Sequence, residues 1–353
     1  MTGGITSPGA GWRQADRGPA TQQTTKKRRK RGGGRGRGEV AMVDDVEFTS
    51  YYGRQIVKTP VWKSPDVPLY LFLGGAAGSS AILGALADVT DRPALTRVAR
   101  YTAGGGSILS VVFLIHDLGR PERFLHMLRV VKVTSPLSVG SYILAPFSAA
   151  AGATAAVELL GWFPRLKRFG GVVAAIFGGP LATYTGVLLA NTAVPSWHEF
   201  HTKLPFVFGG SAMAAGGGIC MAFTPVGEAE PARKMAIMGA GIELAAIRGI
   251  EGSDRIEAEP FHEGRPGTFM RAAKACTTTG LGLAVVAGRR RWGAVTSGAL
   301  LAAGSLLTRF GVFEAGIAST KDPKYIVVPQ RERMAAREAS ASGGPGEARS
   351  VTR

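Results

Sequence analysis

The sequence predicts an all-α integral membrane protein, a bundle of about eight transmembrane helices. Three observations support this fold class. Hydrophobic residues make up 45% of the 353 residues, and 50 residues are glycine. The apolar residues gather in long runs in the middle of the chain, while both ends are polar. The strong runs are apolar on every side, whereas the helices of a soluble all-α protein need a polar stripe that faces water.

Four runs are long enough to cross a bilayer and carry no charged residue. A span takes about 20 mainly apolar residues. The uncharged runs cover residues 68–87, 133–157, 169–197 and 204–227. Two shorter runs, near 101–115 and 292–308, also reach across when the charged residues at their ends lie at the membrane surface.

Two further spans are weaker because they contain charges. One holds Glu243 and Arg248, and the other begins with Arg271 and Lys274. Six spans are therefore the lower bound, and eight is the expected number. The expected spans lie near residues 68–88, 98–117, 136–160, 169–191, 204–225, 233–250, 269–288 and 291–313. Small residues crowd these runs, which lets helix backbones approach closely in lipid.

The two ends of the chain are expected to be disordered tails. Residues 1–45 contain the basic run Lys26–Arg31 and a Gly/Arg stretch, and residues 334–353 are rich in Ala, Ser and Gly. A basic tail can bind nucleic acid or anionic lipid. We expect it on the membrane surface, with no specific nucleic acid partner. No apolar stretch follows the basic run closely enough for a signal peptide, and Met42 is an alternative start.

Eight spans would place both termini on one side of the membrane, which we name the terminal side. The loops near 118–132, 192–203 and 251–267 would lie on that side as well. Lysines and arginines of the short loops are nearly balanced between the two sides. The basic N-terminal tail then favours a cytoplasmic location for the termini.

The cysteines and histidines argue against a bound metal or haem. Cys220 and Cys276 lie inside predicted spans without CxxC spacing, so we expect no iron–sulfur cluster and no thiolate zinc site in this chain. A membrane haem b needs two axial histidines that face each other within the bundle. Of the five histidines, His116 alone lies clearly near a predicted span. We therefore expect no haem and no metal.

The densest polar clusters fall in segments of the terminal side. They are Ser50–Lys63, His116–Phe124, Pro195–His201 and Ser319–Tyr325. Each alone is explained by an interfacial loop with satisfied ion pairs. Together on one face they favour a docking surface for another protein, with the candidate residues Arg120, Glu122, Arg123, Trp197, His198, Glu199, Lys321, Asp322 and Lys324.

Four stretches carry a family resemblance. They are Tyr51-Tyr52-Gly-Arg with Pro60-Val-Trp-Lys, then Tyr70-Leu-Phe-Leu-Gly-Gly, then His116-Asp-Leu-Gly-Arg-Pro-Glu-Arg-Phe with Thr134 to Tyr142, and finally Lys321-Asp-Pro-Lys-Tyr. On these residues the chain resembles the NrfD/PsrC family, the membrane subunits of polysulfide-reductase-type and related molybdopterin oxidoreductases. The resemblance covers roughly residues 47–333 and leaves both tails outside.

The resemblance implies more than the residues themselves do. It implies a haem-free bundle of eight helices in a bacterial cell membrane. Menaquinone or ubiquinone would be bound as a substrate near one membrane face. A ferredoxin-like iron–sulfur subunit would dock there and exchange electrons with a molybdopterin catalytic subunit. Some members of the family contribute to proton translocation. The chain itself would hold no catalytic residue for the complex's terminal substrate.

Five residues are candidates for the quinone site. Such a site needs hydrogen-bond donors, an aromatic wall and a proton route. His116 exchanges protons near neutral pH, and Asp117 beside it can set its tautomer or relay protons. The aromatic candidates are Tyr70, Tyr142 and Trp62. The alternatives stay open: His116 and Asp117 can cap a helix end with Arg120 or Arg123, and the aromatic residues can be interface anchors.

Charged residues inside spans are candidates for a proton relay, because they are costly in lipid. Glu243 in the sixth span is the best candidate, followed by Glu158 and by Asp117. The alternative for Glu243 is a buried ion pair with an arginine of a neighbouring helix. The sequence thus favours a quinone-interacting membrane anchor of an oxidoreductase complex. A membrane transporter and a purely structural anchor are the alternatives.

Overall fold

The computed structural model describes residues 55–342 except 121 and 162. The predicted N-terminal tail, the segment with Tyr51 and Tyr52, and residues 343–353 lie outside this part of the chain. The described residues form helices and connecting loops, and no strand is found among them.

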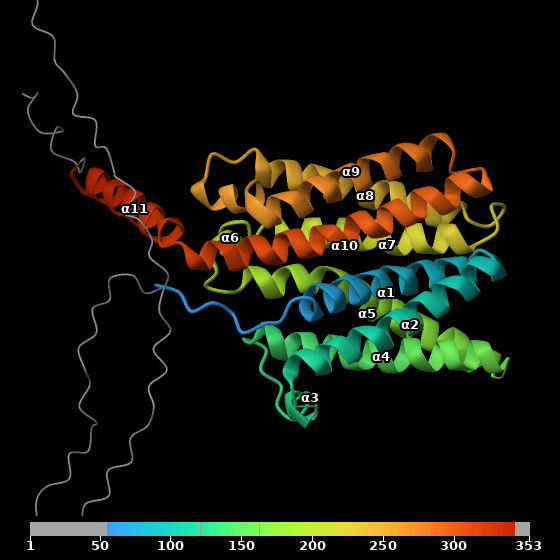
Figure 1. Ribbon diagram of the computed structural model, residues 1–353. Helices are drawn as coiled ribbons and strands as arrows, with labels where there is room; N and C mark the ends of the chain where they lie inside the picture. Colours follow the sequence, from blue (N-terminus) through green and yellow to red (C-terminus); the bar gives the residue numbers. More distant parts are fainter. Residues whose placement is uncertain (1–54, 121, 162, 343–353) are drawn as a thin grey trace, which may run out of the picture. The chain divides into compact units, whose positions relative to one another are not determined.

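Eight long helices form a bundle and divide into two groups of four (Figure 1). The first group contains α1 (Asp66–Val89), α2 (Pro93–Leu118), α4 (Pro136–Leu160) and α5 (Pro164–Ala190). The second group contains α7 (Leu204–Phe223), α8 (Glu230–Glu251), α9 (Gly264–Val286) and α10 (Arg291–Lys321). The groups meet chiefly where α1 and α5 pack against α7.

Local sequence signals explain where several helices begin and end. Proline is the first residue of α2, α4 and α5, where its fixed φ suits a helix and its missing N–H costs nothing. Gly119 and Gly161 end α2 and α4 with φ of 70°, a left-handed conformation that glycine adopts without strain.

Six of the eight helices are long and apolar enough to cross a membrane, and the chain is a multi-pass membrane protein. They are α1, α2, α4, α5, α7 and α10, at the positions of the six stronger predicted spans. The two weaker predicted spans correspond to α8 and α9, with 22 and 23 residues, which pack in the same bundle. That these two also cross the membrane stays a prediction.

Two helices extend further than the sequence suggested. The helix α10 continues past residue 313 to Lys321 and stops before Asp322-Pro323, since proline cannot continue a helix. Arg309 therefore lies inside a helix and is fully buried, not near a span's end. The helix α11 (Lys324–Ser342) continues past the expected boundary at 333, because the residues that follow are good helix formers.

Small residues allow the helices of the bundle to touch through their backbones. The clearest case is Gly78 of α1 against Gly178 of α5, where a Cβ on either residue would collide with the carbonyl oxygen of the other. This agrees with the expected small-residue packing of membrane helices.

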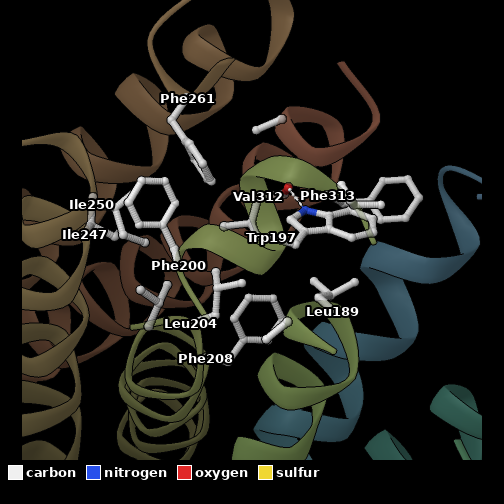
Figure 2. Packing of buried hydrophobic residues seen from close by; sticks show 14 of the residues in the cluster. Leu189, Trp197, Phe200, Leu204, Phe208, Ile247, Ile250, Phe261, Val312 and Phe313 are labelled. Atoms are coloured by element: carbon white, nitrogen blue, oxygen red, sulfur yellow. Dashed lines mark hydrogen bonds between the residues drawn. The ribbon is translucent and has the colours of Figure 1, made fainter. Parts of the chain in front are cut away.

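The loops of the terminal side carry three short elements, α3 (Glu122–Met127), α6 (Pro195–Glu199) and the 3₁₀ helix η1 (Ile256–Phe261). Around α6 and η1 lies the largest apolar cluster among the described residues (Figure 2). Trp197, Phe200, Phe208, Phe261 and Phe313 are its fully or almost fully buried rings. Because the cluster also includes Val67 and Leu71 of α1 and Leu189 of α5, it fixes the terminal-side loops to both groups of helices.

Candidate functional site

A histidine–carboxylate pair lies at the terminal-side end of the first group. Nδ1 of His116, in the last turn of α2, is 2.7 Å from Oδ2 of Asp66, the first residue of α1. The Asp66 side chain is 8% exposed, whereas that of His116 is 72% exposed. A helix N-terminus stabilises a carboxylate, so Asp66 is held by both its helix and the imidazole. The exposed His116 ring therefore connects the buried Asp66 carboxylate to solvent.

Asp117 has a different partner from the one that the sequence suggested. Its Oδ1 accepts a hydrogen bond from the backbone N–H of Lys63, at 2.9 Å. The Lys63 ammonium also approaches the carbonyl oxygen of His116, at 3.4 Å. Asp117 therefore holds the segment before α1 onto the end of α2. The carboxylate that contacts the His116 ring, and so sets its tautomer, is Asp66.

Sequence reasoning missed Asp66. The signal was present, because Asp66 lies four residues before Tyr70 and so on the same face of α1. It was overlooked because an acidic residue in a first helical turn is ordinarily explained by the helix dipole alone.

Tyr70 lines a small cavity between the four helices of the first group. The Ser110 hydroxyl, which also faces this space, donates to the Tyr70 carbonyl oxygen at 3.0 Å. The cavity has a volume of about 50 Å³ and is mainly apolar. Its lining residues are Tyr70, Gly74, Ser110, Leu114, Met127, Leu137, Gly140, Ser141, Leu144, Leu181, Tyr184, Thr185 and Leu188.

Two further tyrosines hold backbone segments beside this cavity. The hydroxyl of Tyr142 donates to the carbonyl oxygen of Leu128 at 2.8 Å, which ties the loop after α3 to α4. Tyr142 is not among the residues that line the cavity. Met127, which precedes Leu128 in the chain, is one of them. The Tyr184 hydroxyl donates to the Pro136 carbonyl oxygen, and its ring fills the space that a side chain at Gly140 would need. Sequence reasoning had not singled out Tyr184.

Trp62 lies away from the cavity, on the second group. Its ring stacks on Trp197, with the ring centroids 5.7 Å apart. Trp197 is fully buried and donates its indole N–H to the carbonyl oxygen of Val312 at 2.7 Å. Trp62 thus anchors the segment before α1. The Trp197 ring lies in the core, so among the docking candidates it is the one that presents no surface in this structure.

Glu243 and Arg309 are both fully buried within the second group. Oε1 of Glu243 accepts a hydrogen bond from the Thr308 hydroxyl at 2.7 Å, while its Oε2 has no protein partner. One Arg309 nitrogen donates to the Phe208 carbonyl oxygen at 2.9 Å, and its Nε and Nη1 have no protein partner. Both buried groups therefore leave hydrogen-bonding capacity unused, and no ion pair joins Glu243 to Arg309 among the described residues.

Glu158, the second relay candidate, belongs to a network of ion pairs at the opposite end of the first group. Its carboxylate lies 2.8 Å from Arg100 and 3.1 Å from Lys167. Arg100, which is 6% exposed, also contacts Asp88 at 3.3 Å. A carboxylate with two close cations is held in its charged form, so Glu158 stabilises the helix ends here and is poorly suited to release and rebind protons.

The remaining docking candidates lie on the terminal side, and most are exposed. Arg120, Glu122, Arg123, His198, Lys321 and Asp322 are exposed, while Glu199 and Lys324 are partly buried. Lys324 pairs with Glu259 at 2.8 Å, which raises the pKa of the ammonium. An open hollow of about 720 Å³ lies beside His198 and Glu199, between α6 and α11. Burial raises the pKa of Glu257 in its wall.

Comparison with known proteins places the chain in a family. The family model described as polysulphide reductase, NrfD matches residues 55–236, just over half of the chain. The match covers the first group of helices with the cavity, α7 and the start of α8, and ends before Glu243. No curated protein matches the chain. On this match, and with six helices able to cross a membrane, the chain belongs to the NrfD family, the membrane subunits of polysulfide-reductase-like complexes.

Proposed function

We propose that this subunit exchanges two electrons and two protons with a membrane quinone, menaquinone or ubiquinone, in the first group of helices. The observation that carries the proposal is the His116–Asp66 pair at 2.7 Å, one helical turn from the tyrosine-lined cavity. The site then combines apolar walls, hydroxyl groups and a route for protons to the terminal side. These are the groups that reduction of a quinone to a quinol requires.

The cavity has to open before a quinone ring enters. Its volume of about 50 Å³ is far below the roughly 300–1,000 Å³ of ligand pockets. The cover is the segment of α3 and the loop after it, which supplies Met127 to the lining and is tied by Tyr142. Entry of the quinone would displace this segment. Because Tyr142 holds the segment in place, it would control how readily the quinone enters the site.

Protons would leave the quinol through Asp66 and His116. Asp66 lies one turn from Tyr70, and His116 contacts Asp66 and is open to solvent. An imidazole titrates near neutral pH and can pass a proton from a buried group to water. Electrons would pass to or from a ferredoxin-like iron–sulfur subunit docked on the exposed terminal-side residues. That subunit would in turn exchange electrons with a molybdopterin subunit.

The proposal includes α8 and α9 as the sixth and seventh of eight membrane helices in a haem-free bundle. Both are long enough to cross, and both pack against helices that meet the composition of a span. Glu243, the charge deepest in α8, faces the protein interior and not lipid. This inward direction removes the main objection to α8 as a span.

A role in proton translocation rests on one separate observation. Glu243 has one carboxylate oxygen without a hydrogen-bond partner, and two nitrogens of the Arg309 guanidinium also lack one, all in fully buried side chains. Buried polar groups of this kind are normally satisfied by internal water. A hydrated carboxylate inside the bundle is suited to hold a proton in transit.

The test is quinol-dependent electron transfer by the complex purified with its co-purifying subunits. We expect His116→Ala to abolish most of this activity and His126→Ala, an exposed histidine on α3, to leave it intact. Equal activity of His116→Ala and the wild type would overturn the proposal. Failure to recover any redox partner, with substrate uptake by vesicles containing the protein alone, would favour a transporter. Recovery of the partners without any quinol activity would favour a structural anchor.

A further inference from the structure

A groove runs along the second group between α8 and α9. Its volume is about 600 Å³, and it opens to the outside of the bundle. It is separate from the tyrosine-lined cavity, which lies within the first group. The lining residues are Leu244, Ala245, Arg248, Glu251, Gly252, His262, Lys274 and Thr278.

The end of the groove at the terminal side is polar and carries an excess of positive charge. Lys274 pairs with Glu251, the last residue of α8. Arg248 is exposed, and among the described residues no carboxylate lies within ion-pair distance of its guanidinium. His262 lines the same end. The one carboxylate is thus already used by the lysine, and the arginine remains available to an anion.

The other end of the groove is small and largely apolar. Leu244 and Ala245 precede Arg248 by one turn of α8, and Thr278 follows Lys274 by one turn of α9. Because the two helices run in opposite directions, these residues lie together, one turn deeper toward the middle of the bundle. Ala245 and Thr278 are exposed, so the strip faces whatever surrounds the protein.

We propose that this groove binds an anionic phospholipid. The phosphate group would be held by Arg248, with Lys274 beside it, and an acyl chain would follow the strip formed by Leu244 and Ala245. A soluble phosphate would use the basic end alone. A lipid uses both ends. With α8 and α9 crossing the membrane as proposed above, the basic end of the groove lies at the membrane interface, where anionic head groups lie.

This assignment also explains a feature of the sequence. Charges in α8 and α9 are what make these helices weak as spans. A lipid phosphate would neutralise Arg248 at the level where the helix enters the membrane, and the long arginine side chain can reach the interface from there.

The test uses the full-length protein in detergent, titrated with phosphatidylglycerol or phosphatidylcholine while its thermal unfolding and its native mass spectrum are recorded. We expect saturable stabilisation and retained lipid adducts with phosphatidylglycerol only. Arg248→Gln should weaken the apparent affinity about fivefold, the size expected for one basic residue near an anionic head group. Arg289→Gln, an exposed arginine in the loop between α9 and α10, is the matched control.

Two further measurements separate the outcomes. Ala245→Trp fills the apolar strip and should reduce lipid retention without removing a charge. Inorganic phosphate at millimolar concentration should neither stabilise the protein nor displace the lipid. The proposal is overturned if Arg248→Gln and Arg289→Gln bind phosphatidylglycerol equally, if Ala245→Trp retains it fully, or if free phosphate alone reproduces the stabilisation.

Discussion

His116 and Asp66 share one hydrogen bond but stand in opposite environments. The carboxylate is buried at a helix N-terminus, and most of the imidazole is exposed. A proton on the pair can therefore move between the interior and water without any large motion. Tyr70, four residues from Asp66, connects the pair to the cavity.

We expect Asp66→Asn to lower quinol-dependent electron transfer at least about a hundredfold, the lower end of the range for loss of a positioned proton acceptor. The amide keeps the size of the side chain but cannot accept the proton. The measurement is steady-state quinol oxidation by the purified complex. Asp117→Asn is the control and should have a smaller effect, since Asp117 binds the Lys63 backbone. A larger loss in Asp117→Asn would reverse these assignments.

Glu243 and Arg309 should be coupled in stability. Arg309→Met removes the buried cation that acts electrostatically on Glu243, and because the two groups are not in ion-pair contact we expect a loss below the roughly 3–5 kcal/mol of a broken buried pair. The double variant Arg309→Met/Glu243→Gln removes both charges and should recover much of this loss. The measurement is thermal unfolding of the wild type, the single variant and the double variant in the same detergent. Additive effects of the two substitutions would mean that the charges do not interact.

At the residue scale the sequence pointed to part of the candidate site. His116 and Tyr70 were identified because their types and positions suit proton exchange at a membrane interface. Asp66 and Tyr184 were not, because their value comes from contacts across helices: Asp66 with the end of α2, and Tyr184 with the start of α4. Such contacts depend on how the helices pack, which composition does not specify.

The helices α1 and α5 pack through glycine. Gly78→Ala should destabilise the protein by about 1–3 kcal/mol, because its Cβ would collide with the Gly178 carbonyl oxygen. Gly105→Ala is the matched control. A Cβ there meets no atom within 4 Å, and alanine favours the helix by up to about 1 kcal/mol. Unfolding in detergent should thus move in opposite directions for the two variants, and a shared direction would contradict the packing.

The cover of the cavity depends on one side-chain hydrogen bond. Tyr142→Phe removes the hydroxyl that holds the Leu128 carbonyl oxygen. We expect faster amide hydrogen exchange in residues 122–135 and an altered KM for quinol. Tyr101→Phe, a partly exposed tyrosine on α2 near the opposite end, should change neither. Unchanged exchange in the Tyr142 variant would show that other contacts hold the loop.

Hydropathy found the six strong helices because an uncharged apolar run of about 20 residues is rarely anything but a membrane span. Hydropathy was less decisive for α8 and α9, because a hydropathy sum penalises a charged residue equally whether its side chain faces lipid or the protein interior. The structure directs Glu243 inward, and only the packing of α8 against α7 and α10 determines that direction. Helix ends past the membrane, as in α10 and α11, follow helix propensity and not hydropathy.

At the scale of the whole molecule, the exposed docking candidates share the terminal side. Charge reversal at Arg120 should weaken co-purification of a soluble partner, because partner binding through exposed charges depends on complementary potential. Arg165→Glu, an exposed arginine at the opposite end of the bundle, is the control. Pull-down at several salt concentrations measures the effect. Equal recovery of the partner with both variants would move the docking surface elsewhere.

The layer between the cavity and the ion pairs of Glu158 has a consequence for energy conversion. Its buried side chains are mainly apolar, among them Ala77, Ala103, Phe147 and Ala151, and in the described part of the chain it contains no titratable side chain between the cavity and Arg100. Protons exchanged through His116 would therefore return to the side from which the electrons arrive. Such a reaction moves no net charge across the bilayer and does not work against the membrane potential. Turnover should then be indifferent to an uncoupler, and any sensitivity to one would have to arise through the second group and Glu243.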